Sequence, residues 1–579
     1  MNMLDNKKND ALEAENRYKT AVESANDYIE NFDILETITN VGNDEVFTPR
    51  KTCEMILDSL PEEVWHNPNY KWLNPATKNG IFEREIAIRL DKGLKDIIPD
   101  IEQRRKHILQ NMIYSIGQTR FTANVARRTI YYCSQANRKC DGIKSDDGHY
   151  VNGYAIGNGT WFDDEEGNIK TPNINHTFVD KRGRLIPAAC SSEQKKKYRC
   201  KYCGINGSSS YNDVNQRETY AYEFIHFSGD DLLEYLQKRF FGGNKKMKFD
   251  IIIGNPPYQL SDGGAKASAR PIYQLFVKQA ILLKPKYISM IMPSRWMAGG
   301  KGLDDFRSSM ISDRHIRLLN DFPDGKICFP NNDIKGGVCF FLWNRDEEGK
   351  CKIIQHIDGK EIESERFLKE DNTDVLIRDS RLVSIYKKVI AYKGGSFSKI
   401  VSPLKPYGLR GDIFKDPSKY ALPPISETKI DGGLIIHGLD EHLKRVVRYI
   451  SVDYPLPKKD LLPGYKLFVA RNQGSGVFGE TLSDPILGGV DELCTETYVV
   501  FGPFKTEKQA KNCWEYVKTK FFRAILGIRK LDQNASQSVY KYIPLLDFDK
   551  KWTDKELFDL FGLSNEEREF IENNVKEMK

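Results

Sequence analysis

The residues best suited to chemistry follow an apolar run that reads FDIIIGNPPY from Phe249 to Tyr258. Phe249–Ile253 is almost continuously apolar, which is typical of a parallel strand buried on both faces. Ligands of such sheets bind beyond the carboxyl ends of the strands. Pro256 disfavours the helical region for Asn255, and each proline fixes its own φ and lacks a backbone N–H. The corner after the strand is therefore stiff and consists mainly of hydrogen-bond acceptors.

This corner could bind a planar primary amine. The side-chain oxygen of Asn255 and the carbonyl oxygen of Pro256 can accept both amine protons, and Tyr258 offers a flat face for a ring. The lone pair of such an amine is delocalised, so two fixed acceptors that favour the pyramidal geometry make the nitrogen a better nucleophile and aim it. The corner is thus suited to alkylation of an amide-like nitrogen. The alternative is a strand that two prolines simply terminate.

The size and composition of the chain limit what can surround this corner. A chain of 579 residues exceeds one ordinary domain, so we expect at least two domains. The formal charge of +6 arises from 87 basic and 81 acidic residues, so a nucleic-acid-binding surface has to be a local patch. No stretch has the character of a signal peptide or the length of a membrane span, which favours a soluble, cytoplasmic protein.

Hydrophobic periodicity divides the chain into parts. Residues 1–40 show helical spacing and predict a helical arm. Residues 41–345 alternate short apolar runs with amphipathic segments, which indicates an α/β sheet with helices on its faces. Within them, residues 133–215 are rich in Gly, Asn, Asp, Ser and Cys and predict an inserted lobe. Residues 346–579, with Pro-rich turns, aromatic strands and a helical end, predict a second domain of α+β type.

The order of several motifs resembles one family, the gamma-class S-adenosylmethionine-dependent N6-adenine DNA methyltransferases of restriction-modification systems. The resemblance runs from about residue 41 to the C-terminus, and it implies a Rossmann-like methyltransferase sheet that transfers a methyl group to a flipped adenine. GNPPY resembles the catalytic motif, which implies that the catalytic residues are Asn255, Pro256, Pro257 and Tyr258. GKICFPNNDIKGGVCFFLW resembles the motif whose aromatic residue closes the other side of the base, so Phe329 would be the stacking partner of Tyr258.

The resemblance also implies where the cofactor binds. NDEVFTPRK resembles the Thr-Pro segment that opens the gamma arrangement, WLNPATKNGIF takes the place of the cofactor loop, and GDDLLEYL that of the acidic contact to the cofactor's adenine. The residues so assigned are Thr48, Pro49, Asn74, Pro75, Gly80, Phe82 and Asp231, with Asp230 as the alternative to Asp231. Two places depart from the family pattern. Lys78 stands where most members have a glycine, and the second strand ends in Gly117 and Gln118, followed by Arg120, without the usual acidic residue for the ribose.

The inserted lobe contains a Cys-x2-Cys pair in KYRCKYCG, a spacing typical of half a structural zinc site. Cys200 and Cys203 form this pair, and we expect Cys133 and His176 to complete a tetrahedral site. The alternative ligands are Cys140 and Cys190. Such a zinc ion would hold irregular loops together and take no part in methyl transfer, because the sulfonium cofactor is already electrophilic. Otherwise these residues are free thiols in a polar lobe.

In the family that the chain resembles, the domain after the catalytic sheet reads the DNA sequence, and residues 346–579 resemble such a target-recognition domain. Their Arg, Lys, Asn and Gln residues, interleaved with aromatics, suit base edges and phosphates of double-stranded DNA. Since no nuclease constellation is evident, a restriction partner would be a separate endonuclease subunit. Two alternatives stay open: another planar nitrogen as acceptor (cytosine N4, RNA adenine or a protein glutamine), and a non-catalytic DNA-recognition subunit.

Overall fold

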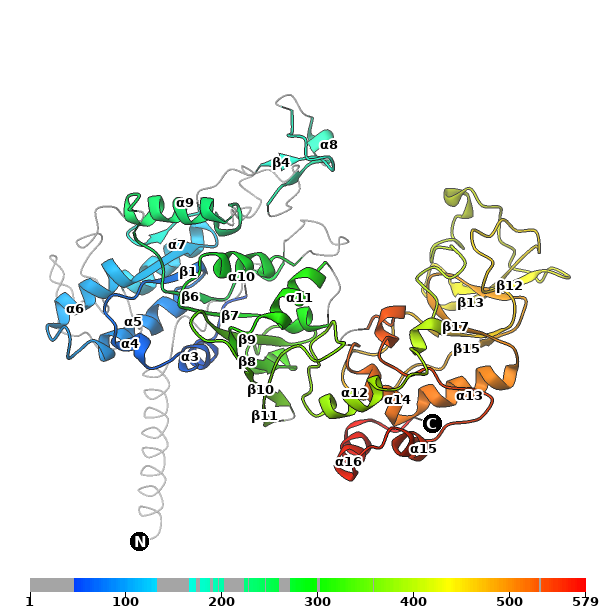
Figure 1. Cartoon of the computed structure of the whole chain (residues 1–579). Coiled ribbons are helices and arrows are strands. Elements are labelled where there is room, and N and C mark those ends of the chain that lie inside the picture. The colour runs from blue at the N-terminus through cyan, green and yellow to red at the C-terminus, as the bar shows by residue number, and fades with distance from the viewer. Residues whose placement is uncertain are drawn as a thin grey trace, which may run out of the picture. The chain divides into compact units, whose positions relative to one another are not determined.

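The computed structural model describes most of the chain, and the structural statements below concern that part (Figure 1). The described residues are 46–132, 166–172, 177–187, 191–195, 197–202, 223–227, 229–244, 246–259, 271–298, 302–357, 359–530 and 533–578. The predicted N-terminal arm, residues 1–40, lies outside them. The chain divides into two compact units. The first runs to Ser294 and includes Asp313–Arg366, and the second combines Arg295–Ser312 with Phe367–Lys579.

The first unit contains a large mixed sheet. Nine strands of the described residues form it, in the order β11-β10-β8-β9-β7-β6-β1-β2-β3. Their bounds are β1 (Trp72–Thr77), β2 (Ile113–Gly117), β3 (Ile169–Lys170), β6 (Ile251–Gly254), β7 (Tyr287–Pro293), β8 (Ile316–Phe322), β9 (Val338–Asn344), β10 (Cys351–Ile357) and β11 (Lys360–Arg366). β3, β2, β1, β6 and β7 run parallel, whereas β9 is antiparallel to both β7 and β8. The strand order therefore reverses between β1 and β6, where parallel sheets bind ligands.

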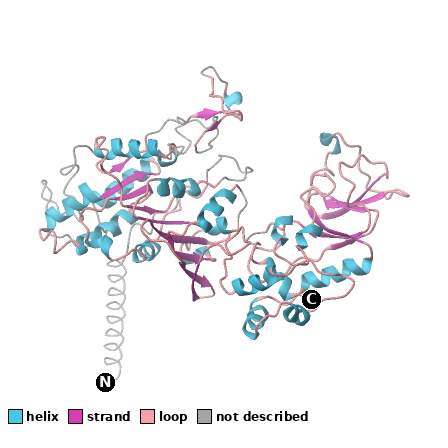
Figure 2. Ribbon diagram, in the orientation of Figure 1, coloured by secondary structure: helices cyan, strands magenta, loops and turns pink. Residues whose placement is uncertain are grey.

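Helices flank this sheet, as the periodicity predicted (Figure 2). They are α3 (Arg50–Asp58), α4 (Glu63–His66), α5 (Ile81–Gly93), α6 (Ile101–His107), α7 (Arg120–Arg127), α9 (Asp230–Phe241) and α10 (Tyr273–Leu282). One apolar cluster joins α3, α4 and α5 to the sheet, and it includes Ile251 and Ile253 of β6 but not Ile252. This alternation shows that both faces of β6 are covered, because all three side chains are buried.

The inserted lobe lies between β3 and α9 in the chain. In its described part, β4 (Phe178–Val179) pairs antiparallel with β5 (Arg199–Cys200), and α8 (Ser192–Lys195) is a short helix. The predicted lobe, residues 133–215, also contained β3, which instead pairs with β2 at the edge of the main sheet. Hydrophobic periodicity did not predict this strand, because it is only two residues long and lies in a polar segment.

The second unit has two small sheets, β13-β12-β16 and β15-β14-β17, among its described residues. The strands are β12 (Leu434–Leu439), β13 (Arg445–Ile450), β14 (Tyr465–Ala470), β15 (Ile486–Gly488), β16 (Glu492–Cys494) and β17 (Tyr498–Phe504). The helices are α11 (Asp304–Ser312), α12 (Leu382–Ile390), α13 (Glu507–Lys518), α14 (Lys520–Leu526), α15 (Asp554–Leu560) and α16 (Asn565–Asn574). The division after Arg366 differs from the predicted one after residue 345, because β10 pairs with β8 of the main sheet.

None of the helices in the described residues combines the length and the apolar character that crossing a membrane requires.

Candidate active site

The end of β6, where the corner begins, lies against Asn74 in the middle of β1. Gly254 has a φ of +155°, and a Cβ atom there would be 2.5 Å from the side-chain oxygen of Asn74. Only glycine fits this close approach without displacing Asn74. The predicted catalytic corner and the predicted cofactor loop are therefore in direct contact at the point where the strand order reverses.

The side chain of Asn255 has a fixed orientation. It is buried, and its Nδ2 donates hydrogen bonds to the carbonyl oxygen of Val46 at 3.1 Å and to Oγ1 of Thr48 at 3.0 Å. A backbone carbonyl can only accept, so the reverse orientation of the amide would place two acceptors together. Among the described residues, Oδ1 of Asn255 has no hydrogen-bond partner although it is buried. The side chain thus keeps one acceptor available.

The two aromatic residues that the resemblance singled out are in contact with each other, and the role of Phe329 on the other side of a base stays a prediction. The ring centroids of Tyr258 and Phe329 lie 6.3 Å apart at an interplanar angle of 86°, which is an edge-to-face contact. Phe329 is 1% exposed and belongs to the apolar core, whereas the Tyr258 ring is partly exposed. Burial raises the pKa of the Tyr258 hydroxyl well above its ordinary value. This hydroxyl has no hydrogen-bond partner within the described residues, so the ring contributes mainly its faces.

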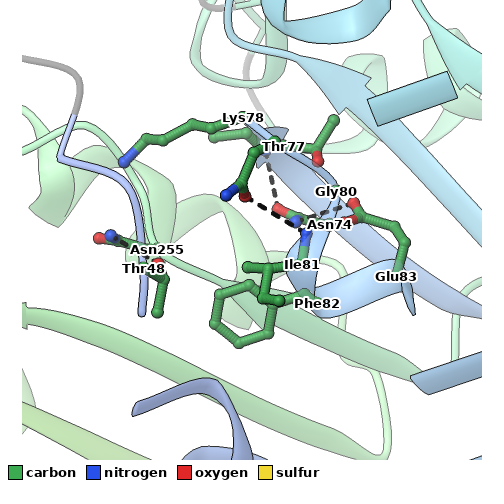
Figure 3. Close-up of a pocket in the computed structure, with 11 residues that line it drawn as sticks. Thr48, Asn74, Thr77, Lys78, Gly80, Ile81, Phe82, Glu83 and Asn255 are labelled. Atoms are coloured by element: carbon green, nitrogen blue, oxygen red, sulfur yellow. Dashed lines mark hydrogen bonds between the residues drawn. The ribbon is translucent and has the colours of Figure 1, made fainter. Parts of the chain in front are cut away.

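The loop between β1 and α5 lines a small hollow that is open to solvent (Figure 3). Gly80 ends this loop directly before α5, with a φ of +82°, and a Cβ atom there would lie 3.0 Å from Cα of Ala126, so the position needs glycine. The residues that line the hollow are Thr48, Asn74, Ala76, Thr77, Lys78, Asn79, Gly80, Ile81, Phe82, Glu83 and Asn255. The structure therefore brings together Thr48, Asn74, Gly80, Phe82 and Asn255 from the predicted set.

The remaining predicted residues do not line this hollow. Pro49 precedes α3, Pro75 lies within β1, and Pro256 and Pro257 are buried beside Asn255. Asp231 lies in the first turn of α9, and its side chain is exposed. Its role as a contact to the cofactor's adenine stays a prediction.

Lys78, the departure from the family's glycine, has a structural role that the sequence did not reveal. Its side chain is buried, and its Nζ donates a hydrogen bond to the carbonyl oxygen of Val46 at 2.8 Å. The same oxygen accepts from Nδ2 of Asn255. One backbone carbonyl therefore connects the cofactor loop with the corner.

Glu83 is a second residue that sequence reasoning missed. It lies in the first turn of α5, 1% exposed, and its Oε1 accepts hydrogen bonds from Nδ2 of Asn74 at 2.9 Å and from Oγ of Ser115 at 2.5 Å. The available signal was its place in GIFERE, where helical spacing turns it toward the same side as Ile86 and Ala87.

The end of β2 explains the missing acidic residue. A Cβ atom at Gly117 would lie 2.5 Å from Cβ of Ala123 in α7, so a side chain does not fit there. The next residue, Gln118, is 1% exposed, and neither polar atom of its side chain has a hydrogen-bond partner among the described residues. Gln118 therefore places a donor and an acceptor where an acid was expected.

The predicted zinc site falls largely outside the described residues, which include Cys200 but not Cys133, His176 or Cys203. Sγ of Cys200 is 3.5 Å from Nε2 of His226, and both side chains are buried. Within the described part of the chain, no group of three or more His, Cys, Asp or Glu side chains could hold a metal ion. The described residues thus do not support the zinc prediction, and His226 is a neighbour that the sequence analysis had not considered.

Comparisons with known proteins identify a family and a relative by sequence. The family model of the Eco57I restriction-modification methylase matches residues 111–329. A Mycoplasma pneumoniae protein described as an uncharacterized adenine-specific methylase is 43% identical over 364 residues, which are 62% of this chain and 81% of that protein.

Two solved structures are similar at lower identity. One is a nuclease-deletion mutant of the Type ISP restriction-modification enzyme LlaGI in complex with a DNA substrate mimic, at 11% identity and a TM-score of 0.41. This match covers 85% of the present chain and 45% of that chain. The other is the Type IIL restriction-modification enzyme MmeI in complex with DNA, at 12% identity and a TM-score of 0.41, covering 86% and 65%. The present chain spans less than two thirds of either one.

Proposed function

This chain belongs to the adenine-specific methylases of restriction-modification systems, and from that premise we propose that it methylates N6 of adenine in double-stranded DNA with S-adenosylmethionine as methyl donor. The observation that carries the proposal is the orientation of Asn255. Its Nδ2 is held by Val46 and Thr48, and its buried Oδ1 is left to accept a hydrogen bond from the target amine.

The corner would raise the nucleophilicity of the adenine amine. Oδ1 of Asn255 and the carbonyl oxygen of Pro256 would each accept a hydrogen bond from N6. These two contacts favour a pyramidal nitrogen with its lone pair directed at the methyl group. As the new N–C bond forms, the S–C bond of the donor breaks. Amide and peptide oxygens are too weakly basic to keep the surplus N6 proton, so it passes to water. Tyr258 holds the base by stacking.

The hollow beside this corner suits a polar cofactor. Besides Asn255, three of its lining residues have buried polar side-chain atoms without hydrogen-bond partners in the described residues: Thr77, Asn79 and Glu83. Buried polar groups are nearly always paired, so a cluster of unpaired ones favours a ligand that supplies the partners. When bound, S-adenosylmethionine supplies an electrophilic methyl group. We propose that Thr48, Asn74, Gly80 and Phe82 contact it, as the resemblance implied.

The proposed reaction also requires that the adenine leaves the duplex and that the DNA sequence is recognised. The target adenine has to leave the duplex to reach Asn255, because the N6 group of a stacked base is inaccessible to the corner. We propose that the second unit, Phe367–Lys579 with Arg295–Ser312, recognises the DNA sequence, and that cleavage of unmodified DNA belongs to a separate endonuclease subunit.

The test is incubation of the full chain with unmethylated genomic DNA and labelled S-adenosylmethionine, followed by mass spectrometry of the nucleosides. We expect N6-methyladenine from the wild-type chain and a loss of at least a hundredfold in Asn255→Ala. Asn111→Ala, at an exposed position away from the hollow, is the matched control. N4-methylcytosine as the product would redirect the proposal to another base. A folded chain that binds DNA without methylating it would favour a recognition subunit.

A further inference from the structure

The hollow contains one acidic residue, Glu83, and its carboxylate is only half satisfied. Oε1 accepts hydrogen bonds from Asn74 and Ser115, whereas Oε2 is buried and has no hydrogen-bond partner among the described residues. Figure 3 shows the Glu83 carboxylate directed toward Asn74 and the turn at Gly80. A carboxylate oxygen in this position is available to a ligand in the hollow.

The nearest cationic side chains are engaged elsewhere. Arg84 pairs with Glu85 at 3.0 Å, and Nζ of Lys78 donates to the carbonyl oxygen of Val46. No lysine, arginine or histidine of the described residues forms an ion pair with Glu83. Burial raises the pKa of the Glu83 carboxyl above its ordinary value, and the polar groups around it, namely Ser115, the backbone N–H of Glu83, Thr77 and Asn74, lower it in part. Since a buried carboxylate without a counter-charge is costly, this site gains most from a ligand that brings a positive charge.

We propose that Glu83 is the counter-charge for the α-ammonium group of the cofactor's methionine end, with Oε2 accepting one of its protons. This inference rests on the proposed use of S-adenosylmethionine. Of the two cationic centres in that molecule, only the ammonium group has N–H donors, and only these match a carboxylate oxygen.

The sequence around Glu83 supports this assignment. Asn74 of β1 is neutral, and its Nδ2 donates to Glu83, so it orients the carboxylate without adding a charge. The negative charge of the site is therefore that of Glu83, in the first turn of α5, which a hydrogen bond joins to Asn74. A carboxylate near a helix N-terminus is also stabilised by the helix dipole.

The alternative is that Glu83 only braces β1 against β2 through Asn74 and Ser115. Ligand chemistry separates the two roles, because a brace would affect every ligand of the hollow equally. The probes are S-adenosylhomocysteine, which keeps the α-ammonium group, and its analogue with hydrogen in place of that group. Calorimetry measures the binding of both probes to the full-length wild type, Glu83→Gln and Ser115→Ala. Ser115→Ala is the matched control because it removes a hydrogen bond from Glu83 and leaves the charge.

We expect the wild type to bind S-adenosylhomocysteine at least about tenfold more tightly than the deamino analogue. Glu83→Gln should lose this preference, and Ser115→Ala should keep it. A Glu83→Gln protein that weakens both probes by the same factor, or neither, overturns the proposal. If that variant does not fold, equal affinity of the wild type for both probes overturns it as well. A wild type that binds neither probe would instead refute the use of this cofactor, on which the inference rests.

Discussion

The amide nitrogen of Asn255 donates a hydrogen bond to the hydroxyl oxygen of Thr48 at 3.0 Å, across 207 positions of the chain. Thr48 therefore does more than line the hollow, because it helps to fix the orientation of the Asn255 amide. The Thr-Pro segment and the catalytic corner are parts of one arrangement.

We expect Thr48→Val, which keeps the shape and removes the hydroxyl, to lower the single-turnover methylation rate about tenfold or more, since Asn255 then loses one of its two orienting contacts. Thr48→Ser keeps the hydroxyl and should retain most of the rate. Rapid-quench measurements at saturating cofactor and DNA provide the test. An unchanged rate in Thr48→Val would show that the carbonyl oxygen of Val46 suffices to orient the amide.

Tyr258 should act through its ring and not through its hydroxyl. The hydroxyl has no hydrogen-bond partner in the described part of the chain, so Tyr258→Phe should stay within about threefold of the wild-type kcat. Tyr258→Ala should lose at least about tenfold, because a stacking face worth roughly 1–3 kcal/mol disappears. Steady-state methylation of a short duplex distinguishes them. Equal losses in both variants would give the hydroxyl a role in binding.

Gly254→Ala should destabilise the first unit by roughly 1–3 kcal/mol, since the new Cβ would collide with Asn74 at a φ that favours glycine. Gly242→Ala is the control, because that glycine also has a positive φ, +58°, but has no atom within 4 Å of the added Cβ. Urea unfolding followed by circular dichroism measures both. If the two variants lose the same stability, the contact with Asn74 is not the reason for glycine at 254.

Lys466 predicts a pH dependence of the second unit. Its side chain is buried, and burial lowers the pKa of its ammonium group to about 8, against an unfolded value of 10.5. Between these values the unfolded chain binds the proton and the folded chain does not, so stability should rise from pH 8 to 10.5. Three groups oppose this lowering of the pKa: the carboxylate of Glu492, which pairs with His437, the buried Cys494 and the exposed Asp491.

Urea unfolding across this pH range, followed by tryptophan fluorescence, measures the effect. Lys466→Met should flatten the rise, because the titrating group is gone. A rise of the same size in the variant would assign the pH dependence to other groups.

The zinc prediction is tested by metal content. If Cys200 binds zinc, as its spacing predicts, Nε2 of His226 lies 3.5 Å from its sulfur and is placed to be a fellow ligand. We then expect about one zinc per chain by elemental analysis and a clear loss of zinc in Cys200→Ser and His226→Ala. Cys513→Ala, in the core of the second unit, controls for the loss of a thiol. A zinc-free wild type refutes the prediction.

The parts of the site that the sequence predicted are those in which local chemistry decides the structure. The apolar run before Asn255 could only be a buried strand, and the prolines and Gly80 fix backbone shapes that few residues allow. Long strands such as β7 and β9 were visible for the same reason.

What the sequence did not reveal depends on tertiary contacts. β3 is held by its pairing with β2 and has no pattern of its own, and β10 belongs to the first unit because of its register with β8. Glu83 looks like an ordinary helical acid until the structure shows it buried. The lack of space at Gly117, which excludes an acid, is set by Ala123 in a different element.

The carbonyl oxygen of Val46 accepts hydrogen bonds from both Lys78 and Asn255, and this shared acceptor has a thermodynamic consequence. If the methyl donor binds in the hollow as proposed and moves Lys78, the carbonyl oxygen that Lys78 shares with Asn255 changes its hydrogen bonding as well. Binding of the methyl donor and binding of the target adenine then become cooperative. By reciprocity, each ligand must change the affinity of the chain for the other by the same factor. The carbonyl oxygen of Val46 thereby couples occupation of the hollow to the orientation of Asn255.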